Sequence, residues 1–420
     1  MIEQDNSVSQ TVEASCCIAG GGPAGMMLGF LFARAGVEVL VLEKHADFLR
    51  DFRGDTIHPS TLEVMYELGI LDEFLQRSHQ ELTQIGGQIE DSEVTIADFS
   101  HLPTHCKFIA LMPQWDFLNF IAEKAKLYPE FHLRMESEVT DLIEDSGRIV
   151  GVRATTMDGV LEVRSNLIVG ADGRHSIVRK RAGFEVIDRG APIDVLWMRI
   201  SRQPNDPNQA LGRFRAGKIL VTIPRGDYWQ CAFVIPKGGF DEIRQKGLPA
   251  FREEIASAAP SLRGRVGELK DWNDIKILSV AVDHLSQWSR TGLLCIGDAA
   301  HAMSPVGGVG INLAIQDAVA AANILAEPLR HGAIGDELLG KVQQRREYPM
   351  NIIQRFQVFA HKRFIRPALN AKTQTGRLPL PLRLLQRFPL LRRIPARVIG
   401  LGFRPEHVYT SDVHSVSRTS

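Results

Sequence analysis

Hydrophobic residues recur with different periods along this 420-residue chain, and the N-terminal part contains two short apolar runs, 14–19 and 37–42. Between them, residues 26–34 are small and apolar, as in a helix that packs closely on a strand. The resulting order of strand, glycine turn, helix and strand is that of a nucleotide-binding α/β unit. Two more helices are expected over 59–68 and 117–127.

The middle of the chain has the period of β-strands. The stretch 131–163 alternates between apolar and polar residues, which predicts a β-meander with Asp158-Gly159 as a hairpin turn. A buried strand then ends at Asp172-Gly173, and another at 293–296 precedes an Ala-rich helix over 313–325. Between these two strands the pattern predicts a second, mostly antiparallel sheet. Its strands are expected at 197–200, 211–215, 218–224 and 228–235.

The first turn carries the clearest candidate chemistry. It reads Gly20-Gly21-Gly22-Pro23-Ala24-Gly25, and the strand after the helix ends in Glu43. Gly20 allows a tight turn, Gly22 lets backbone N–H groups approach a pyrophosphate, and Gly25 allows the helix to pack close to the strand. A carboxylate at Glu43 accepts ribose hydroxyls and repels a 2′-phosphate, which favours FAD or NAD over NADP at this site. The alternative is an ordinary glycine turn in an α/β unit.

Polar residues at other loop and strand ends are further candidates. Arg53 lies in a charged loop after Glu43, from which it could reach the pyrophosphate, and Gln114 stands at a helix entrance. Asp172 and Asp298 follow buried strands, where open α/β sheets bind their ligands. A glycine-rich loop then leads into the Ala-rich helix and exposes N–H groups at its start. The residues of this loop that we select are Pro305, Gly307, Gly308, Val309, Gly310, Ile311 and Asn312.

The second sheet must present a face to something other than the nucleotide, and we expect that face to bind the substrate. Each candidate taken alone is more simply an ordinary sheet residue, but together they mark the substrate side. The six side chains capable of shaping a pocket are Trp197, Arg199, Arg213, Arg215, Trp229 and Gln230.

Composition narrows the class of protein. The formal net charge is zero, which gives no overall attraction to nucleic acid. The five cysteines are an odd number without a C-x-x-C spacing, so we expect reduced thiols and no metal site. Residues 1–11 lack the features of a secretory signal, and no apolar run is long enough to cross a membrane. A cytoplasmic enzyme is the expectation.

The segment 362–404 differs from the rest in charge. It holds eleven Lys and Arg and no acidic residue, which leaves 38 basic against 49 acidic residues elsewhere, a net charge of −11. Apolar residues are interleaved, which suits contact with an anionic membrane surface or partner. We favour the alternative, packing on the acidic body of the same molecule, because prolines at 379, 381, 389 and 395 prevent one long amphipathic helix.

Three separated motifs together resemble the single-component FAD-dependent aromatic hydroxylases, the family that includes para-hydroxybenzoate hydroxylase. They are the 20–25 turn with Glu43, the Asp172-Gly173 element, and Gly297-Asp298 with the 305–312 loop. The resemblance implies that Glu43 binds the adenosine ribose of FAD. It implies that Arg53 and Gln114 contact the FAD phosphates and ribityl, that Asp298 holds the ribityl chain, and that Asp172 contributes to FAD and NAD(P)H handling. Residues 307–312 would meet the isoalloxazine, with Pro305 beside the flavin.

The same resemblance implies a reaction. Reduced flavin would react with O₂ to give a C4a-hydroperoxide that hydroxylates an aromatic or polycyclic phenol-like molecule, with NADH or NADPH as a transient co-substrate. The resemblance does not assign a side-chain acid or base. Val309 stands where the para-hydroxybenzoate enzymes have lysine, which argues against that particular substrate. Whether the protein is a monomer or a homodimer stays open.

Two alternatives remain at this stage. The first is an FAD-dependent epoxidase or hydroxylase of a lipidic or quinone-precursor substrate at a membrane surface. The second, from a different class, is a flavin-binding regulatory protein without turnover. A flavin-dependent halogenase is disfavoured because no W-x-W-x-I-P segment occurs.

The expected fold is α/β with an α+β insert, in three parts. A discontinuous Rossmann-like FAD-binding domain is interrupted by an antiparallel-sheet substrate domain and followed by a helical, basic tail. The FAD-binding domain is assigned to 12–80, 111–190 and 286–340, the substrate domain to 81–110 and 191–285, and the tail to 341–420.

Overall fold

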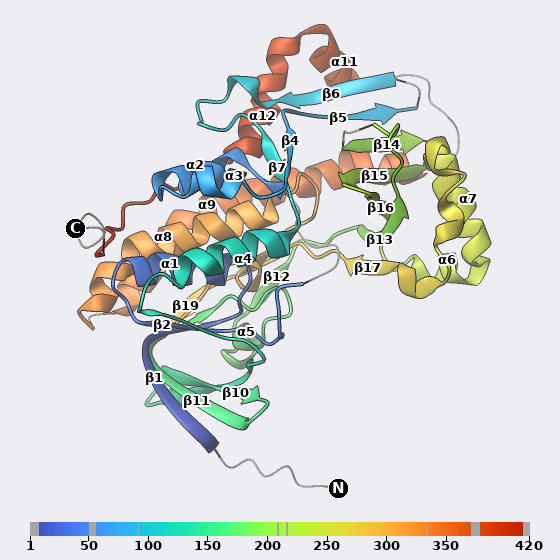
Figure 1. Ribbon diagram of the computed structural model, residues 1–420. Helices are drawn as coiled ribbons and strands as arrows, with labels where there is room; N and C mark the ends of the chain where they lie inside the picture. Colours follow the sequence, from blue (N-terminus) through green and yellow to red (C-terminus); the bar gives the residue numbers. More distant parts are fainter. Residues whose placement is uncertain are drawn as a thin grey trace, which may run out of the picture.

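The computed structural model describes residues 8–49, 56–90, 92–207, 210–215, 217–332, 334–370 and 379–414. One half of the molecule is built on a sheet with strand order β19-β20-β11-β1-β2-β8 (Figure 1). All neighbours in this order are parallel except β19 and β20. The strands are β1 (Val8–Ala19), β2 (Val39–Leu42), β8 (Phe131–Arg134), β11 (Gly159–Gly170), β19 (Ser289–Arg290) and β20 (Leu293–Cys295).

Helices cover this sheet because its central strands are apolar on both faces. On one face, α1 packs between α4 and α8, and all residues of β2 are buried beneath them. Two strands, β9 and β10, extend β11 as the predicted antiparallel meander. The elements are α1 (Pro23–Arg34), α4 (Gln114–Ala125), α8 (Gly310–Arg330), β9 (Glu138–Asp145), β10 (Arg148–Thr156) and α5 (Ile177–Arg181).

The other half contains the predicted second sheet, with strand order β17-β13-β16-β15-β14-β5-β6. Helices α6 (Phe240–Lys246) and α7 (Leu248–Ala258) cover one of its faces, seen at the right of Figure 1. The strands are β5 (Gln84–Ile89), β6 (Ser92–Asp98), β13 (Ile193–Ser201), β14 (Leu211–Arg215), β15 (Lys218–Arg225), β16 (Tyr228–Pro236) and β17 (Lys276–Ser279).

Two small three-stranded sheets and two short helices connect the halves. The predicted assignment of all of 81–110 to the substrate sheet holds for β5 and β6, whereas β4 and β7 pair with β3 instead. The second small sheet contains β12, β18 and β21. The connecting elements are β3 (Thr56–Ile57), α2 (Pro59–Glu67), α3 (Leu71–Leu75), β4 (Gln80–Leu82), β7 (Ile109–Leu111), β12 (Val186–Asp188), β18 (Asp283–Leu285) and β21 (His301–Ala302).

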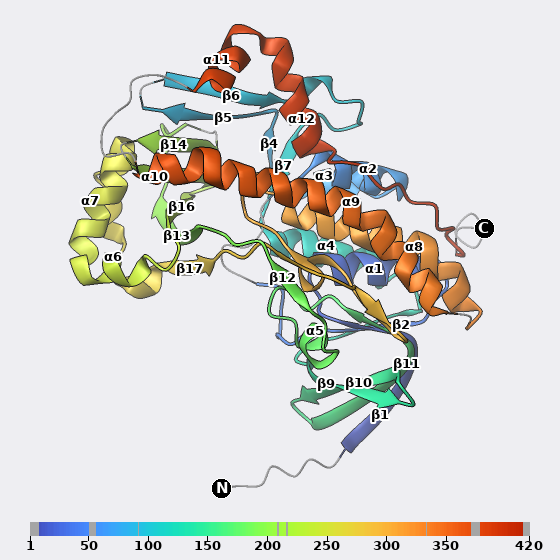
Figure 2. The ribbon, with the colours of Figure 1, turned by 180° about the vertical axis from the view of Figure 1, so that it is seen from behind.

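The predicted start of the tail, at 341, falls inside a long helix and is therefore misplaced. Helix α9 (Asp336–Ala360) packs on α8 and continues through a π-helical turn, His361–Ile365, into α10 (Arg366–Asn370). Seen from behind, it runs from the first half of the molecule to the second sheet (Figure 2). It buries polar side chains, which hid its core role from a hydrophobicity pattern.

The described remainder of the tail packs on the same molecule. Helices α11 (Leu380–Arg387) and α12 (Arg393–Gly400) lie on β6. The chain then returns along the nucleotide-binding half, where Val413 N–H donates to the Arg34 carbonyl at 3.1 Å and the Tyr128 hydroxyl donates to Asp412 at 2.9 Å. The ion pairs of this returning segment include Asp412 with Arg34 and Glu406 with Arg345, whereas the α11 and α12 arginines form no ion pair with a described carboxylate.

A buried histidine joins α12 to the start of α2 and makes stability depend on pH. His58 Nδ1 lies 2.8 Å from the Ile399 carbonyl, and burial lowers the His58 pKa to about 4. Its Nε2 has no partner within the described residues, so protonation would bury an unpaired N–H. The unfolded state therefore binds the proton more readily between pH values of about 6.5 and about 4.

We expect the free energy of unfolding to fall by about 1.4 kcal/mol per pH unit from this group as the pH drops from about 6.5 toward about 4. Urea denaturation of the wild type and of His58→Asn across this pH range measures the effect. The free energy of unfolding of the variant should depend less steeply on pH. His132→Asn, at an exposed histidine, is the control and should leave the slope unchanged. Equal slopes for wild type and His58→Asn would contradict the assignment.

Candidate functional site

The glycine turn between β1 and α1 has the shape of a phosphate cradle. Gly20 has φ +106°, and a Cβ there would lie 2.4 Å from the Ala171 carbonyl oxygen. A Cβ on Gly25 would lie 2.0 Å from the Gly20 oxygen, so both glycines are required by backbone packing. Gly22 differs, because a Cβ there would meet nothing within 4 Å. This open space lies at the start of α1, where no side chain caps the helix. It fits an anion.

Glu43 lies beside this turn at the end of β2. Its buried carboxylate accepts hydrogen bonds from Gly21 N–H at 2.9 Å and from His45 N–H at 3.1 Å. These bonds fix both oxygens next to the glycine turn, and the oxygens retain lone pairs for ribose hydroxyls. The geometry fits the adenosine end of a dinucleotide.

The loop at 305–312 is ordered by hydrogen bonds with the start of α2. Gly307 and Gly308 have φ of +84° and +64°, which brings the chain into the start of α8. Asn312 Oδ1 accepts from His58 N–H at 2.9 Å and from the Thr61 hydroxyl at 2.8 Å, so its side chain supports the loop. The first-turn N–H groups of α8 have no side-chain cap, which fits a ligand with an electron-rich edge.

Helix α9 supports the same loop around Pro305, a role that the sequence did not reveal. Gln357 accepts from Ser304 N–H at 3.1 Å and donates to the Ser304 and Val306 carbonyls at 2.9 and 3.0 Å. One turn later, His361 Nε2 lies 2.8 Å from the Ser304 hydroxyl. In the sequence, the signal for this supporting role would have been a polar residue at a helix position where the pattern places apolar residues.

The two strand-end aspartates have different surroundings. Asp298 lies in the short 3-10 helix Gly297–Ala299, is 34 % exposed, and has Arg174 at 3.7 Å. Asp172 Oδ2 accepts from Ile177 and Val178 N–H at 2.7 and 3.1 Å, and burial raises the pKa of this carboxyl. Its Oδ1 is buried without a partner in the described chain, which leaves it for a bound molecule.

The two remaining cofactor candidates are less defined. Gln114 is the first residue of α4, three residues before the expected helix start at 117, and its side chain is half-buried. Arg53 lies outside the described residues.

The six substrate candidates do not share one face of the second sheet, which corrects the expectation that they line one pocket. Trp229 packs in a buried hydrophobic cluster that includes Phe251 of α7. Arg213 lies opposite Leu220, a member of the same cluster, on the neighbouring strand. Arg215 pairs with Lys218, whose ammonium contacts Ser257 of α7. The helix-covered face thus holds Arg213, Arg215 and Trp229.

The opposite face, which we call the inner face, holds Trp197, Arg199 and Gln230. Arg199 and Gln230 are directly opposed, and the Arg199 guanidinium lies 4.9 Å from the Tyr228 ring centroid. Trp197 packs with apolar residues of β7 and α12. This face therefore combines an apolar region with a polar end.

Arg225 completes the polar end, although it lies just beyond the strand predicted at 218–224. It is buried, and its Nε lies 3.3 Å from Gln230 Oε1. Burial raises the pKa of Asp116, in the first turn of α4, and the guanidinium groups of Arg77 and Arg225 oppose that rise. The inner face therefore approaches the start of α4, where Gln114 lies.

A charged cluster beneath the site was also absent from the prediction. Asp317 of α8 accepts from Gly297 N–H at 3.1 Å and from Arg346 Nε at 2.9 Å, and lies 2.6 Å from His301 Nε2. Arg346 reaches Glu406 at 3.4 Å, and all four side chains are buried. The cluster connects the Gly297-Asp298 turn to α9 and the C-terminal segment.

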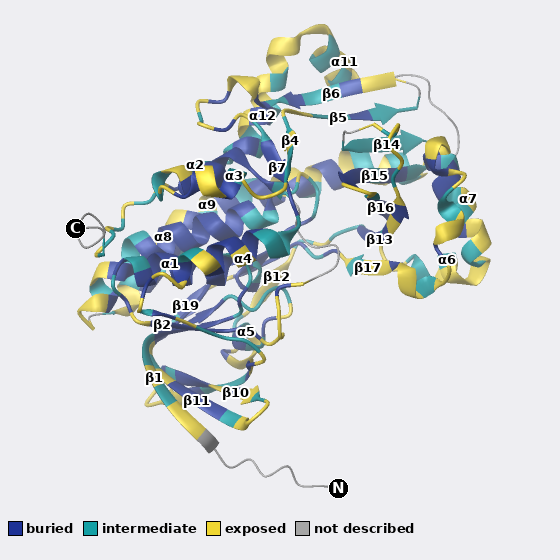
Figure 3. Ribbon diagram, viewed as in Figure 1, coloured by how far each residue is buried: buried dark blue, intermediate teal, exposed yellow. Residues whose placement is uncertain are grey.

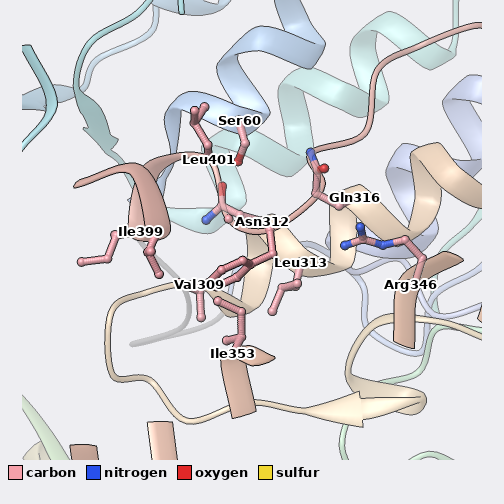
Figure 4. Close-up of a pocket in the computed structure, with 12 residues that line it drawn as sticks. Ser60, Val309, Asn312, Leu313, Gln316, Arg346, Ile353, Ile399 and Leu401 are labelled. Carbon is pink, nitrogen blue, oxygen red and sulfur yellow. The ribbon is translucent and has the colours of Figure 1, made fainter. Parts of the chain in front are cut away.

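A small cavity lies behind the 307–312 loop (Figure 4). Val309, Asn312 and Leu313 meet Ile353 of α9 and Ile399 of α12 there. Its volume of about 30 Å³ suits water and is far too small for an aromatic ring. The cavity is therefore part of the support of the loop rather than a substrate pocket.

Comparison with known proteins defines the class. A family model described as "FAD binding domain" matches residues 13–356, so the chain belongs to this family. The glycine cradle, Glu43 and the uncapped start of α8 fit FAD, and the chain is an FAD-dependent monooxygenase. NAD(P)H is the co-substrate typical of the family. The comparisons support the aromatic hydroxylase interpretation and neither of its alternatives.

The chain is 32 % identical over 397 residues to a 6-methylpretetramide 4-monooxygenase of Streptomyces rimosus, a match that covers 91 % of both chains. It is 29 % identical to a rifampicin monooxygenase of Streptomyces venezuelae, covering 72 % of this chain and 61 % of that protein.

Solved structures share the fold. The anhydrotetracycline hydroxylase OxyS of Streptomyces rimosus matches with a TM-score of 0.75 and 24 % identity, over 93 % of this chain and 76 % of that one. The p-nitrophenol 4-monooxygenase PnpA of Pseudomonas putida matches with a TM-score of 0.74 and 17 % identity, over 93 % and 98 %.

Proposed function

We propose that this monooxygenase hydroxylates a polycyclic phenol-like molecule bound on the inner face of the second sheet. Two observations support the substrate class. The inner face pairs an apolar surface around Trp197 with the buried polar residues Arg225 and Gln230. Two relatives are named for their action on 6-methylpretetramide and anhydrotetracycline. The single observation that carries the proposal is the buried Arg225–Gln230 pair at the polar end of a face that is apolar around Trp197.

FAD would be held along the other half of the molecule. Glu43 would bind the adenosine ribose, and the N–H groups around Gly22 would bind the pyrophosphate. Asp298 would hold the ribityl chain, and the start of α8, residues 307–312, would meet the isoalloxazine beside Pro305. Arg53, Gln114 and Asp172 remain proposed contacts. When bound and reduced by NAD(P)H, FAD supplies the reaction with O₂.

The chain's own residues would position the substrate and exclude water. Trp197 and its apolar neighbours bury the ring system, while Gln230 and Arg225 orient a phenolic oxygen. A guanidinium there favours the phenolate, which makes the ring a better nucleophile. Gln357 and His361 hold the loop around Pro305 in place from behind. We assign no side-chain acid or base.

Arg225→Met is expected to lower kcat/KM roughly 10- to 100-fold with a polycyclic phenol such as anhydrotetracycline, because a hydrogen bond to a charged group is lost. Arg225→Lys should restore part of it. Substrate-stimulated NAD(P)H oxidation and formation of hydroxylated product measure the effect. Arg215→Met, with the same charge change on the helix-covered face, should leave kcat/KM unchanged.

Two outcomes would contradict different parts of the proposal. Wild-type kcat/KM in Arg225→Met would remove Arg225 from the site. Stimulation by p-nitrophenol but not by any polycyclic phenol would overturn the substrate class while leaving the monooxygenase in place.

The proposal includes a cytoplasmic location, with the protein a monomer or homodimer. All five cysteines are free and buried, which suits a reducing compartment. Size-exclusion chromatography with light scattering distinguishes the two oligomeric states.

A further inference from the structure

The outward side of residues 380–397 is unlike the rest of the surface. Helix α11 contacts the body through its half-buried side, where Gln386 Nε2 donates to the Glu93 carbonyl at 2.6 Å. Helix α12 buries Ala396 against Phe99 and Leu102. The opposite side of both helices faces solvent and forms one end of the molecule (Figure 3). Within the described chain, no helix is long and apolar enough to cross a bilayer.

Large apolar side chains are concentrated on this outward side. Leu380 and Leu384 are four residues apart on α11, and Phe388 follows directly after this helix. Leu390 and Ile394, in the elements that follow, are 68 % and 64 % exposed. Arginines lie between them at the same spacing. We define the basic apolar face as Leu380, Arg383, Leu384, Arg387, Phe388, Leu390, Leu391, Arg393, Ile394 and Arg397.

The charge of this face is not neutralised by its surroundings. The segment 362–404 contains no acidic residue. In the described part of the chain, none of the four arginines on the face forms an ion pair with a carboxylate, although ion pairs are frequent elsewhere on the molecule. The face is therefore both apolar and cationic.

We propose that the basic apolar face docks on an anionic lipid surface. Helices that lie flat in a membrane interface place apolar side chains among the acyl chains and cations at the headgroups. Arginine suits this boundary because its apolar stem is buried while its charge stays at the phosphates. The short, proline-separated helices lie on the body of the protein, so their outward side chains would enter the interface without any segment crossing it.

The distribution of charge favours lipid over a protein partner. Protein interfaces have a core depleted of charge, surrounded by a polar rim. Here Arg383 and Arg387 lie between Leu380, Leu384 and Phe388, so no apolar patch free of charge exists on α11. A second copy of this chain is disfavoured because a symmetric interface would bring the same arginines together.

Flotation of the full-length holoenzyme with vesicles tests the proposal. The vesicles are phosphatidylcholine alone or a phosphatidylcholine–phosphatidylglycerol mixture. We expect binding to the anionic vesicles only, weakened by salt, and roughly tenfold or more weaker for Arg383→Gln/Arg387→Gln. Leu384→Ser/Phe388→Ser should also bind weakly. Each variant should retain FAD absorbance and turnover, since these residues lie outside the proposed active site.

Matched controls carry the same changes elsewhere on the surface. Lys246→Gln/Arg263→Gln removes two exposed cations, and Leu127→Ser/Met157→Ser removes two exposed apolar side chains. Both should bind vesicles like the wild type.

Three results would overturn the proposal: no flotation of the wild type, equal flotation with neutral vesicles, or unchanged flotation of both face variants. A dimer that dissociates in Leu384→Ser/Phe388→Ser, without flotation of the wild type, would instead assign the face to a second copy. None of these outcomes bears on the hydroxylation assay.

Discussion

Arg346→Met is expected to lower the free energy of unfolding by about 3–5 kcal/mol, because it leaves the buried carboxylates of Asp317 and Glu406 without their shared cation. All three side chains are 1 % exposed, so water cannot replace the guanidinium. Urea denaturation of the holoenzyme in excess FAD measures the loss.

Arg345→Met is the matched control from the neighbouring position. Arg345 also binds Glu406, at 2.9 Å, but its side chain is 52 % exposed, so its removal should cost about 1 kcal/mol or less. Equal losses for the two variants would show that the buried cluster contributes no more than a surface ion pair. A larger loss of unfolding free energy for Arg345→Met than for Arg346→Met would show that the exposed ion pair, and not the buried one, is the more stabilising.

Gly22→Ala is expected to weaken FAD binding by roughly 10- to 100-fold while the apoprotein remains folded, since a methyl group forced into a filled site typically costs about 1–3 kcal/mol. The added Cβ meets no protein atom within 4 Å, so any clash must come from the bound molecule. Fluorescence titration of apoprotein with FAD measures the affinity, and circular dichroism measures the fold.

Two other glycines separate cofactor binding from folding. Gly25→Ala should destabilise the apoprotein itself, because its Cβ would lie 2.0 Å from the Gly20 oxygen. Gly264→Ala, where a Cβ has open space away from the site, should change neither property. Wild-type FAD affinity in Gly22→Ala would show that the cradle does not bind the pyrophosphate.

The hydrophobic pattern predicted much of the fold because strand alternation and turn residues depend only on neighbours in the sequence. Alternation placed strands at 211–215, 218–224 and 228–235, and the structure has them at Leu211–Arg215, Lys218–Arg225 and Tyr228–Pro236. The glycine motif at 20–25 and its flanking apolar runs predicted a tight turn, and the structure gives Gly20 the positive φ that this requires.

The substrate face was predicted less well because residue type does not indicate which side of a sheet is covered. Arg213 and Trp229 looked equivalent to Arg199 and Gln230 in sequence, but α7 covers the first pair and not the second. Arg225 lay just outside the predicted strand 218–224, and only its position at the end of β15 reveals that it is buried beside Gln230.

The sequence by itself determined the cofactor class, the two-sheet architecture and the loop at 305–312, because each rests on motifs in which neighbouring residues act together. Only the tertiary structure showed which side chains lie on each face of the second sheet. It also showed which buried residues support the site from behind. Asp317, Arg346, Gln357 and Glu406 are polar residues that a pattern assigns to the surface. They are buried because partners from distant segments satisfy their hydrogen bonds and charges, and such pairing leaves no periodic signal.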